Sequence, residues 1–168
     1  MLSLSKPERL IRLNVGCGSR RKLGYINVDK YVEADRQMDI VKLDFDDESV
    51  TEVRAVHVLE HVSIDEGRQA VSEWVRVLKP NGKVHIEVPD FAVCLKMFLN
   101  DPEPYKWWIR TIYGLQSAEG QYHKCGYTFA YLKGLLEEAG MSHVTRLSHP
   151  RYWDAFFIEN LVVEAIKR

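Results

Sequence analysis

Two short runs near the start of the chain decide its fold: Leu13-Asn14-Val15-Gly16-Cys17-Gly18 and Tyr25-Ile26-Asn27-Val28-Asp29. An apolar run that stops on Gly-x-Gly indicates a buried strand entering a tight turn, where a backbone without Cβ atoms can approach a ligand closely. The second run predicts a neighbouring strand, and the carboxylate at its end is placed to reach a ribose diol. Together the two runs predict a nucleoside-binding entrance.

The spacing of the glycines and of Asp29 in these two runs differs from that of a dinucleotide-binding fingerprint. The third glycine of such a fingerprint would fall at position 21, which is Arg21, so the pattern does not favour a pyrophosphate held at a helix start. Gly18 and Asp29 are separated by 29 − 18 = 11 positions, against about 20 in dinucleotide-binding folds. We therefore expect the first crossover helix to be shortened to a turn.

Length and charge limit the remaining possibilities. The chain has 168 residues and a net charge of −1, which fits one domain over 1–168 with a real core and gives no overall attraction to nucleic acid or membrane. Cys17, Cys94 and Cys125 are far apart and form no CxxC motif, which favours a reducing compartment. Because we find neither a run of membrane-span length nor a signal peptide, we expect a cytoplasmic protein without nucleic-acid or membrane partners.

Strand and helix patterns alternate over the first two thirds of the chain, which predicts an α/β fold with a mostly parallel sheet and helices on both faces. From Phe91 to Tyr127 prolines and glycines interrupt the pattern, and this region has the composition of a lid or insert. Beyond the two opening runs, we expect strands over Val53–Val58, Lys83–Val88, Val144–Leu147 and Leu161–Ile166, a helix over Asp65–Leu78, and a helix capped by Thr128 that ends at Ala139.

Several segments in register resemble class I S-adenosylmethionine-dependent methyltransferases of the compact bacterial type. Besides the opening runs they are Val56-His57-Val58-Leu59-Glu60-His61, Arg76-Val77-Leu78-Lys79-Pro80-Asn81-Gly82, Val88-Pro89-Asp90 and Gly134-Leu135-Leu136-Glu137-Glu138-Ala139-Gly140-Met141. The resemblance implies a Rossmann-like, mostly parallel seven-stranded sheet with the last strand reversed. It also implies S-adenosyl-L-methionine as cofactor and methyl transfer as the reaction.

The same resemblance implies the cofactor-binding residues. Gly16, Cys17 and Gly18 would lie against the methionine and ribose portions, and Asp29 would accept hydrogen bonds from the ribose hydroxyls. Asp44 matches the carboxylate that accepts from the adenine amino group, with Phe45 beside the ring. The alternative for Asp44 is a solvated acidic loop, since Asp39, Asp46 and Asp47 crowd the same stretch.

Two histidines are the predicted catalytic residues. The resemblance implies that His57 falls where the fourth strand delivers its loop to the sulfonium, so it also counts among the cofactor-binding residues. In the methyltransferase topology, the loop of His123 would cross above the carboxyl ends of the strands, where the ring can take a proton from an acceptor. A loop histidine with only a local hydrogen bond is the alternative for His123.

Aromatic side chains of the region 91–127 can stack on a sugar or face the sulfonium charge, with core packing as the alternative. They are Tyr105, Trp107, Trp108, Tyr113, Tyr122 and Tyr127. We expect a small-molecule acceptor, with a sugar or related metabolite preferred.

Two other functions stay open. His57-Val58-Leu59-Glu60-His61 spells HxxEH, a metalloprotease signature that needs a helix and a third ligand, for which Glu137 or Glu138 are candidates. The β-branched residues around it favour a strand end, so we predict no metal site. The chain can also bind S-adenosylmethionine or S-adenosylhomocysteine without catalysis, and aminopropyl transfer on the same fold ranks lower because no acidic amine site is evident.

Overall fold

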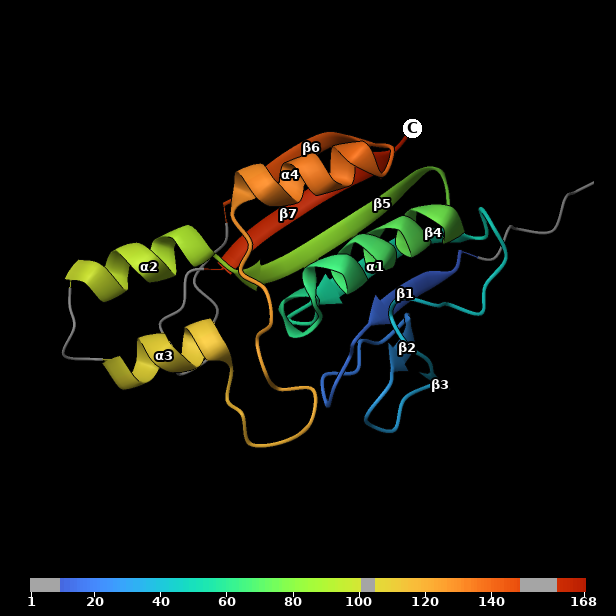
Figure 1. The fold of residues 1–168 in the computed structure, drawn as a ribbon. Coiled ribbons are helices and arrows are strands. Elements are labelled where there is room, and N and C mark those ends of the chain that lie inside the picture. Colours follow the sequence, from blue (N-terminus) through green and yellow to red (C-terminus); the bar gives the residue numbers. More distant parts are fainter. Residues whose placement is uncertain (1–9, 101–104, 149–159) are drawn as a thin grey trace, which may run out of the picture.

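The computed structural model describes residues 10–100, 105–148 and 160–168. Its centre is a seven-stranded sheet with the order β3-β2-β1-β4-β5-β7-β6 (Figure 1). Strands β1 to β5 pair in parallel, whereas β7 runs antiparallel to both β5 and β6. The strands are β1 (Arg12–Val15), β2 (Ile26–Asp29), β3 (Arg36–Gln37), β4 (Val50–Val56), β5 (Leu78–Pro89), β6 (Met141–Leu147) and β7 (Asn160–Lys167). The predicted Rossmann-like sheet with a reversed last strand is confirmed.

The shortened first crossover is also confirmed, because a turn and no helix connects β1 to β2. Buried amides hold this turn in place. The Asn14 side-chain amide donates to Asn27 Oδ1 at 2.9 Å, and the same oxygen accepts from the backbone N–H of Lys22 at 2.7 Å. Arg21, at the position of the absent third glycine, instead forms an ion pair with Asp35 at 2.9 Å.

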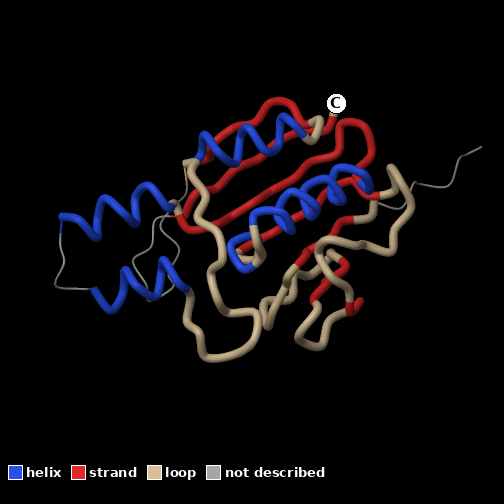
Figure 2. Tube along the Cα trace, viewed as in Figure 1, coloured by secondary structure: helices blue, strands red, loops and turns tan. Residues whose placement is uncertain are grey.

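Helices α1 (Ile64–Val77) and α4 (Phe129–Glu138) lie side by side on one face of the sheet (Figures 1 and 2). Ser63 caps α1 in a reciprocal capping box with Glu66, and the hydroxyl of Thr128 caps α4 as predicted. Trp74 of α1 and Leu136 of α4 are fully buried in the same core cluster as the apolar strand residues. Both helices therefore stabilise the sheet by burying apolar surface on this face.

The expected helix cover on the second face is not seen among the described residues. Alternate strand positions there carry charged side chains that pair across the strands: Glu52, Arg54, Lys83, His85, Glu87 and Glu164. The physical reason is that the connections between β1, β2, β3 and β4 form turns and loops and no helix that could supply an apolar stripe. Among the residues that the structure describes, helices therefore pack on one face of the sheet.

The region 91–127 is more regular than the sequence suggested. Helix α2 (Phe91–Asn100) and helix α3 (Tyr105–Tyr113) project beyond the carboxyl end of β5, and the loop 114–127 returns the chain to α4 (Figure 1). The predicted strand over Val53–Val58 ends at Val56, because a 3₁₀ turn, η1 (Leu59–His61), follows. Within the described ranges, no helix is both long and apolar enough to span a membrane.

Candidate functional site

The two glycines of the first turn have different structural reasons for being glycine. Both have positive φ, +62° at Gly16 and +52° at Gly18. A Cβ on Gly16 would overlap Cγ2 of Val58, in the loop after β4, whereas a Cβ on Gly18 would meet nothing within 4 Å. Gly16 is thus required for close packing of two loops, whereas Gly18 faces open space.

Asp29 at the end of β2 fixes the geometry of this turn. Its side chain is buried, with Oδ2 accepting from the Gly18 backbone N–H at 2.8 Å. Oδ1 accepts from the backbone N–H groups of Tyr31 at 2.8 Å and Val32 at 3.1 Å. A carboxylate offers about four lone-pair positions, so one position is left for a further donor. The predicted ribose carboxylate is therefore also the group that orders the turn around it.

Cys17 lies between the two glycines with its thiol buried. Its backbone N–H donates to Val28 O at 3.1 Å, which fastens the turn to β2. Burial, together with the nearby Asp29 carboxylate, raises the pKa of the thiol, so the thiolate form is disfavoured at neutral pH. Cys17 contributes backbone to the turn and is not an activated nucleophile.

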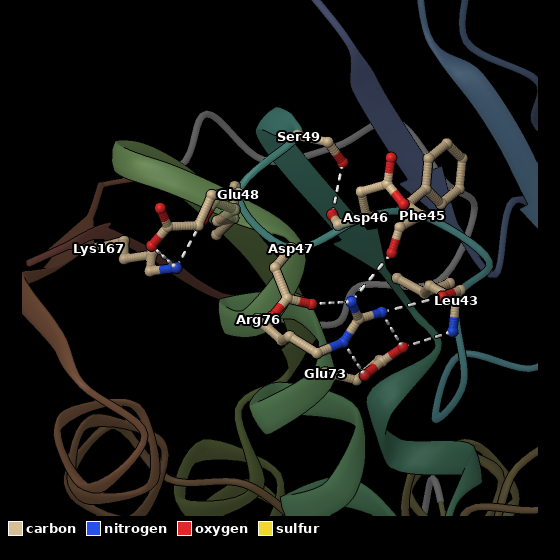
Figure 3. Close-up of polar contacts among 10 residues, drawn as sticks. Leu43, Phe45, Asp46, Asp47, Glu48, Ser49, Glu73, Arg76 and Lys167 are labelled. Atoms are coloured by element: carbon tan, nitrogen blue, oxygen red, sulfur yellow. Dashed lines mark hydrogen bonds and ion pairs between the residues drawn. The ribbon is translucent and has the colours of Figure 1, made fainter.

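Asp44 and Phe45 do not come together with the glycine turn. Figure 3 shows the acidic stretch around them fastened to the last turn of α1, where the Arg76 guanidinium donates to Phe45 O at 2.9 Å and to Leu43 O at 3.0 Å. The glycine turn contacts the loop that precedes the first turn of α1. A helix of 14 residues is about 21 Å long, so the two sites lie at opposite ends of it. Asp44 itself is exposed.

Asp39 is the acidic residue that the structure places near Asp29. Met38 donates its backbone N–H to Asp29 O at 3.0 Å, and the Asp39 carboxylate accepts from Lys30 Nζ at 2.8 Å. Lys30 and Val41 hydrogen bonds outweigh burial and lower the pKa of Asp39, so it is ionised at neutral pH. Five carboxylates stand at positions 39 to 48. Their spacing in the sequence alone does not distinguish Asp39 from the others as the residue near the cofactor site.

His57 occupies the bend between β4 and η1 with a positive φ of 51°. Its Nδ1 lies 3.1 Å from Glu60 Oε1, and its Nε2 lies 3.3 Å from the side-chain amide of Asn160. Burial opposes the charged ring, but the hydrogen bond and charge of Glu60 outweigh it and raise the pKa of His57. Both ring nitrogens are thus engaged with protein groups.

His61 and His123 meet beside Glu60, with their ring centroids 4.8 Å apart in an edge-to-face arrangement. His61 Nδ1 lies 3.2 Å from Tyr122 O, and His123 Nδ1 lies 2.7 Å from Thr111 O in α3. The Lys124 backbone N–H donates to Glu60 O at 2.7 Å, so the loop 114–127 is pinned over η1. The structure therefore brings both predicted catalytic histidines, His57 and His123, close to Glu60.

The HxxEH segment does not form the metalloprotease arrangement. Its Glu-His end lies in a 3₁₀ turn and its first histidine lies outside any helix, whereas the signature needs both histidines on one helix face. Glu138 pairs with Arg68 at 2.9 Å and Glu137 with Lys133 at 3.5 Å, all exposed on the helical layer. Neither candidate for a third ligand reaches the motif.

A cavity of about 470 Å³ opens between the end of β2 and the loop 114–127. Tyr31, two residues after Asp29, lies on one side, and His61 and Tyr122 lie on the other. The complete lining is Tyr31, His61, Gln116, Ser117, Ala118, Glu119, Gly120, Tyr122 and Lys124. Of the predicted lid aromatics, Tyr122 lines the cavity and Tyr127 is a core residue stacked on Tyr131 at 5.5 Å. Tyr113 is exposed, and the side chains of Tyr105, Trp107 and Trp108 lie outside the described residues.

Comparison with known proteins agrees with this geometry. Residues 13–86 match the family model described as a methyltransferase domain, a range that includes the glycine turn, Asp29 and η1. No curated protein sequence matches the chain significantly.

Several solved structures with the same fold are described as methyltransferases. One from Methanosarcina mazei is 19% identical, with a TM-score of 0.64 over 96% of this chain and 94% of that one. One from Archaeoglobus fulgidus is 17% identical, with a TM-score of 0.62 over 95% of this chain and 87% of that one. The 1,6-didemethyltoxoflavin-N1-methyltransferase of Burkholderia thailandensis, with bound 1,6-didemethyltoxoflavin and S-adenosylhomocysteine, is 16% identical, with a TM-score of 0.61 over 94% of this chain and 70% of that one.

Proposed function

We propose that this chain is a class I S-adenosylmethionine-dependent methyltransferase, as its match to a methyltransferase domain model and its fold support, and that it methylates a small hydroxylated acceptor of the sugar class. The observation that carries the acceptor class is the polar and aromatic lining of the cavity beside Asp29. Tyr31 and Tyr122 offer ring faces for the apolar side of a sugar ring. Gln116 and Ser117 offer donors and acceptors for its hydroxyl groups.

We propose that Gly18, Asp29 and Asp39 hold the cofactor, while Gly16 and Cys17 contribute backbone to the same turn. Open space at Gly18 and a spare lone pair on Asp29 fit a ribose diol. Asp39 replaces Asp44 as the carboxylate for the adenine amino group, since it lies beside the Asp29 backbone. When bound, S-adenosylmethionine supplies a methyl group already activated by its sulfonium.

The two predicted catalytic histidines receive different roles in this proposal. His123 has Nδ1 committed to a backbone carbonyl, and its Nε2 is the atom that takes a proton from the acceptor hydroxyl. His57 has both nitrogens engaged and acts as a positioning residue for Glu60. The loop that carries His123 also covers the cavity, which excludes water from the transfer.

Location and macromolecular partners remain proposals as well. We place the protein in the cytoplasm, without a nucleic-acid or membrane partner. Support comes from the near-neutral net charge and from Cys17, Cys94 and Cys125, which are all free thiols.

The first experiment measures cofactor binding and transfer separately. Calorimetry with S-adenosylmethionine and S-adenosylhomocysteine should show one site per chain. Incubation with methyl-labelled cofactor and a panel of nucleotide sugars, free sugars, phenols and amines should transfer label to a hydroxylated sugar. Transfer to amines or phenols alone would contradict the acceptor class. Tight binding with no transfer to any acceptor would favour the non-catalytic binding module.

A second experiment tests His123. The variant His123→Asn should keep the affinity for S-adenosylmethionine near that of the wild type, because the side chain lies outside the cofactor turn. Turnover should fall by roughly 10² or more, the scale of a lost general base. His143→Asn, an exposed histidine on β6, is the matched control and should leave both quantities unchanged. Wild-type turnover in His123→Asn would remove His123 from the reaction.

A further inference from the structure

Three side chains with metal-ligating atoms converge at the carboxyl end of β4: Glu60 and His61 from η1, and His123 from the loop 114–127. One ligating atom from each residue lies within 4.8 Å of the other two. The methyl transfer proposed above uses only His123 of this group. The convergence of the other two side chains therefore needs a separate explanation.

Glu60 gives the first indication that a ligand belongs here. Its side chain is only 2% exposed, and Oε1 is engaged by His57 at 3.1 Å. Oε2 is buried and has no hydrogen-bond partner among the described residues. Leaving a buried charged oxygen unpaired is costly, and such atoms are rare in folded proteins. A cation bound at Oε2 would remove that cost.

The two histidines give an independent indication, because each ring is held by Nδ1. The contacts go to the backbone oxygens of Tyr122, at 3.2 Å from His61, and of Thr111, at 2.7 Å from His123. A carbonyl oxygen only accepts, so in each neutral ring Nδ1 carries the proton and Nε2 holds the lone pair. Metal-ligating histidines are oriented in this way, by donation of the second ring N–H to a carbonyl or carboxylate.

We propose that Glu60, His61 and His123 bind one divalent transition-metal ion, through a carboxylate oxygen and two Nε2 atoms. Two histidines and one glutamate form the donor set of many catalytic zinc sites, in which a fourth position stays open. Bonds of about 2.1 Å at tetrahedral angles place ligand atoms about 3.4 Å apart, so the cluster must contract when the ion binds. His61 lies at the surface of the cavity, and its side chain has room to make that movement.

The site also gives the ion a use within the proposed reaction. Because His61 lines the cavity, an ion held by this cluster would lie within reach of an acceptor hydroxyl. Such an ion would make the hydroxyl lose its proton to water in the cavity more readily, as it does for metal-bound water. In the metal-bound form the ion would thus replace His123 Nε2 in activating the hydroxyl, and His123 would serve as a ligand. This use rests on the proposed function, but binding of the ion does not.

Metal binding is tested on the untagged full-length chain after treatment with a chelator. Zn²⁺ is titrated in competition with a chromophoric chelator, and Co²⁺ is added separately to record its visible spectrum. We expect one Zn²⁺ per chain and an intense Co²⁺ band of low coordination number. His61→Ala and His123→Ala should each weaken Zn²⁺ binding by at least 100-fold, and His143→Ala, the exposed control, should not. Mg²⁺ at millimolar concentration should not compete, since it prefers oxygen ligands.

The outcomes separate this proposal from the proposed function. Equal Zn²⁺ affinity in the wild type and in the double variant His61→Ala/His123→Ala would overturn the metal site, as would no binding below 1 mM Zn²⁺. Because Glu60→Gln can unfold the chain, the melting curve of this variant is recorded first. If the variant does not fold, the two histidine variants alone decide the result. Calorimetry with S-adenosylmethionine on the same sample shows whether the methyltransferase assignment stands when the metal site does not.

Discussion

Replacing Asp29 by alanine should damage both the turn and the cofactor site. The carboxylate accepts from the backbone N–H groups of Gly18, Tyr31 and Val32, and alanine offers no acceptor to any of them. Tyr31 and Val32 are exposed, so water can replace part of what is lost, and each bond is worth roughly 1 kcal/mol net. The free energy of unfolding should fall by about 3 kcal/mol, which lowers Tm by about 6 to 12 °C in a chain of this size.

The variant Asp29→Asn separates the two effects. The asparagine amide oxygen can still accept hydrogen bonds from the backbone N–H groups of Tyr31 and Val32. The decrease in the free energy of unfolding should therefore be only about 1 kcal/mol. The charge-assisted bond to the ribose is lost all the same, and S-adenosylhomocysteine affinity should fall at least tenfold, or about 1.4 kcal/mol. Melting curves and calorimetry on both variants measure the two quantities. Asp44→Asn, an exposed carboxylate at the far end of α1, is the control and should change neither.

A clear result would refute this reasoning. If Asp29→Ala melted within 2 °C of the wild type and bound S-adenosylhomocysteine within a factor of three, Asp29 would neither order the turn nor contact the ribose, since a 3 kcal/mol loss predicts a larger shift. Equal losses of affinity in Asp44→Asn and Asp29→Asn would restore Asp44 to the site.

Three further predictions concern stability. Gly16→Ala should lower Tm far more than Gly18→Ala, because both carry the positive-φ cost of about 1 to 2 kcal/mol but only Gly16 also meets Val58; similar Tm values would contradict this. Arg76→Ala removes the hydrogen bonds that hold the acidic stretch in Figure 3. The free energy of unfolding, measured with urea, should fall by about 1 to 3 kcal/mol, and cofactor affinity should not change. A loss of affinity would mean that this stretch contacts the ligand. Burial opposes charge on His85, but Glu87 at 2.9 Å and Glu164 at 3.0 Å outweigh it and raise its pKa above 6.5. The stability that the charged His85 contributes is fully present below pH 6.5 and is lost as pH rises through its folded-state pKa. The difference in free energy of unfolding between the wild type and His85→Gln should therefore shrink over that range. A constant difference would show that these ion pairs do not stabilise the fold.

The parts of the fold predicted from sequence depend on local signals. Gly-x-Gly after an apolar run, the Thr128 cap and the short distance to Asp29 each involve residues close in sequence, and all of them appear in the structure. Helix α2 was missed because its sequence is apolar around most of its circumference, so it lacks the one-sided pattern that marks a surface helix. The charged face, on which the described residues place no helix, was not predicted because βαβ patterning assumes a helix in every crossover.

The site was predictable only where one strand end supplied the residue. Asp29 is the last residue of β2, so its position could be predicted from the strand pattern. The choice between Asp39 and Asp44 depends on how the segment 38–49 runs along α1, and no local sequence pattern predicts that path. The pairing of His61 with His123 joins positions far apart in sequence through the loop 114–127. Such a contact follows from tertiary packing, and the resemblance to methyltransferases indicated His57 and His123 but not His61.

The charged second face of the sheet limits how this chain can be rebuilt. Arg54 on β4 pairs with Glu87 on β5, and Lys83 on β5 pairs with Glu164 on β7, so each strand is matched to its neighbour's charge. A helix grafted over β4, β5 and β7 on this face would place an apolar stripe over these ions and remove their water without giving them new partners. A chimera with a longer methyltransferase must therefore exchange whole strands together with their helices, and charge reversals on this face must be made in pairs.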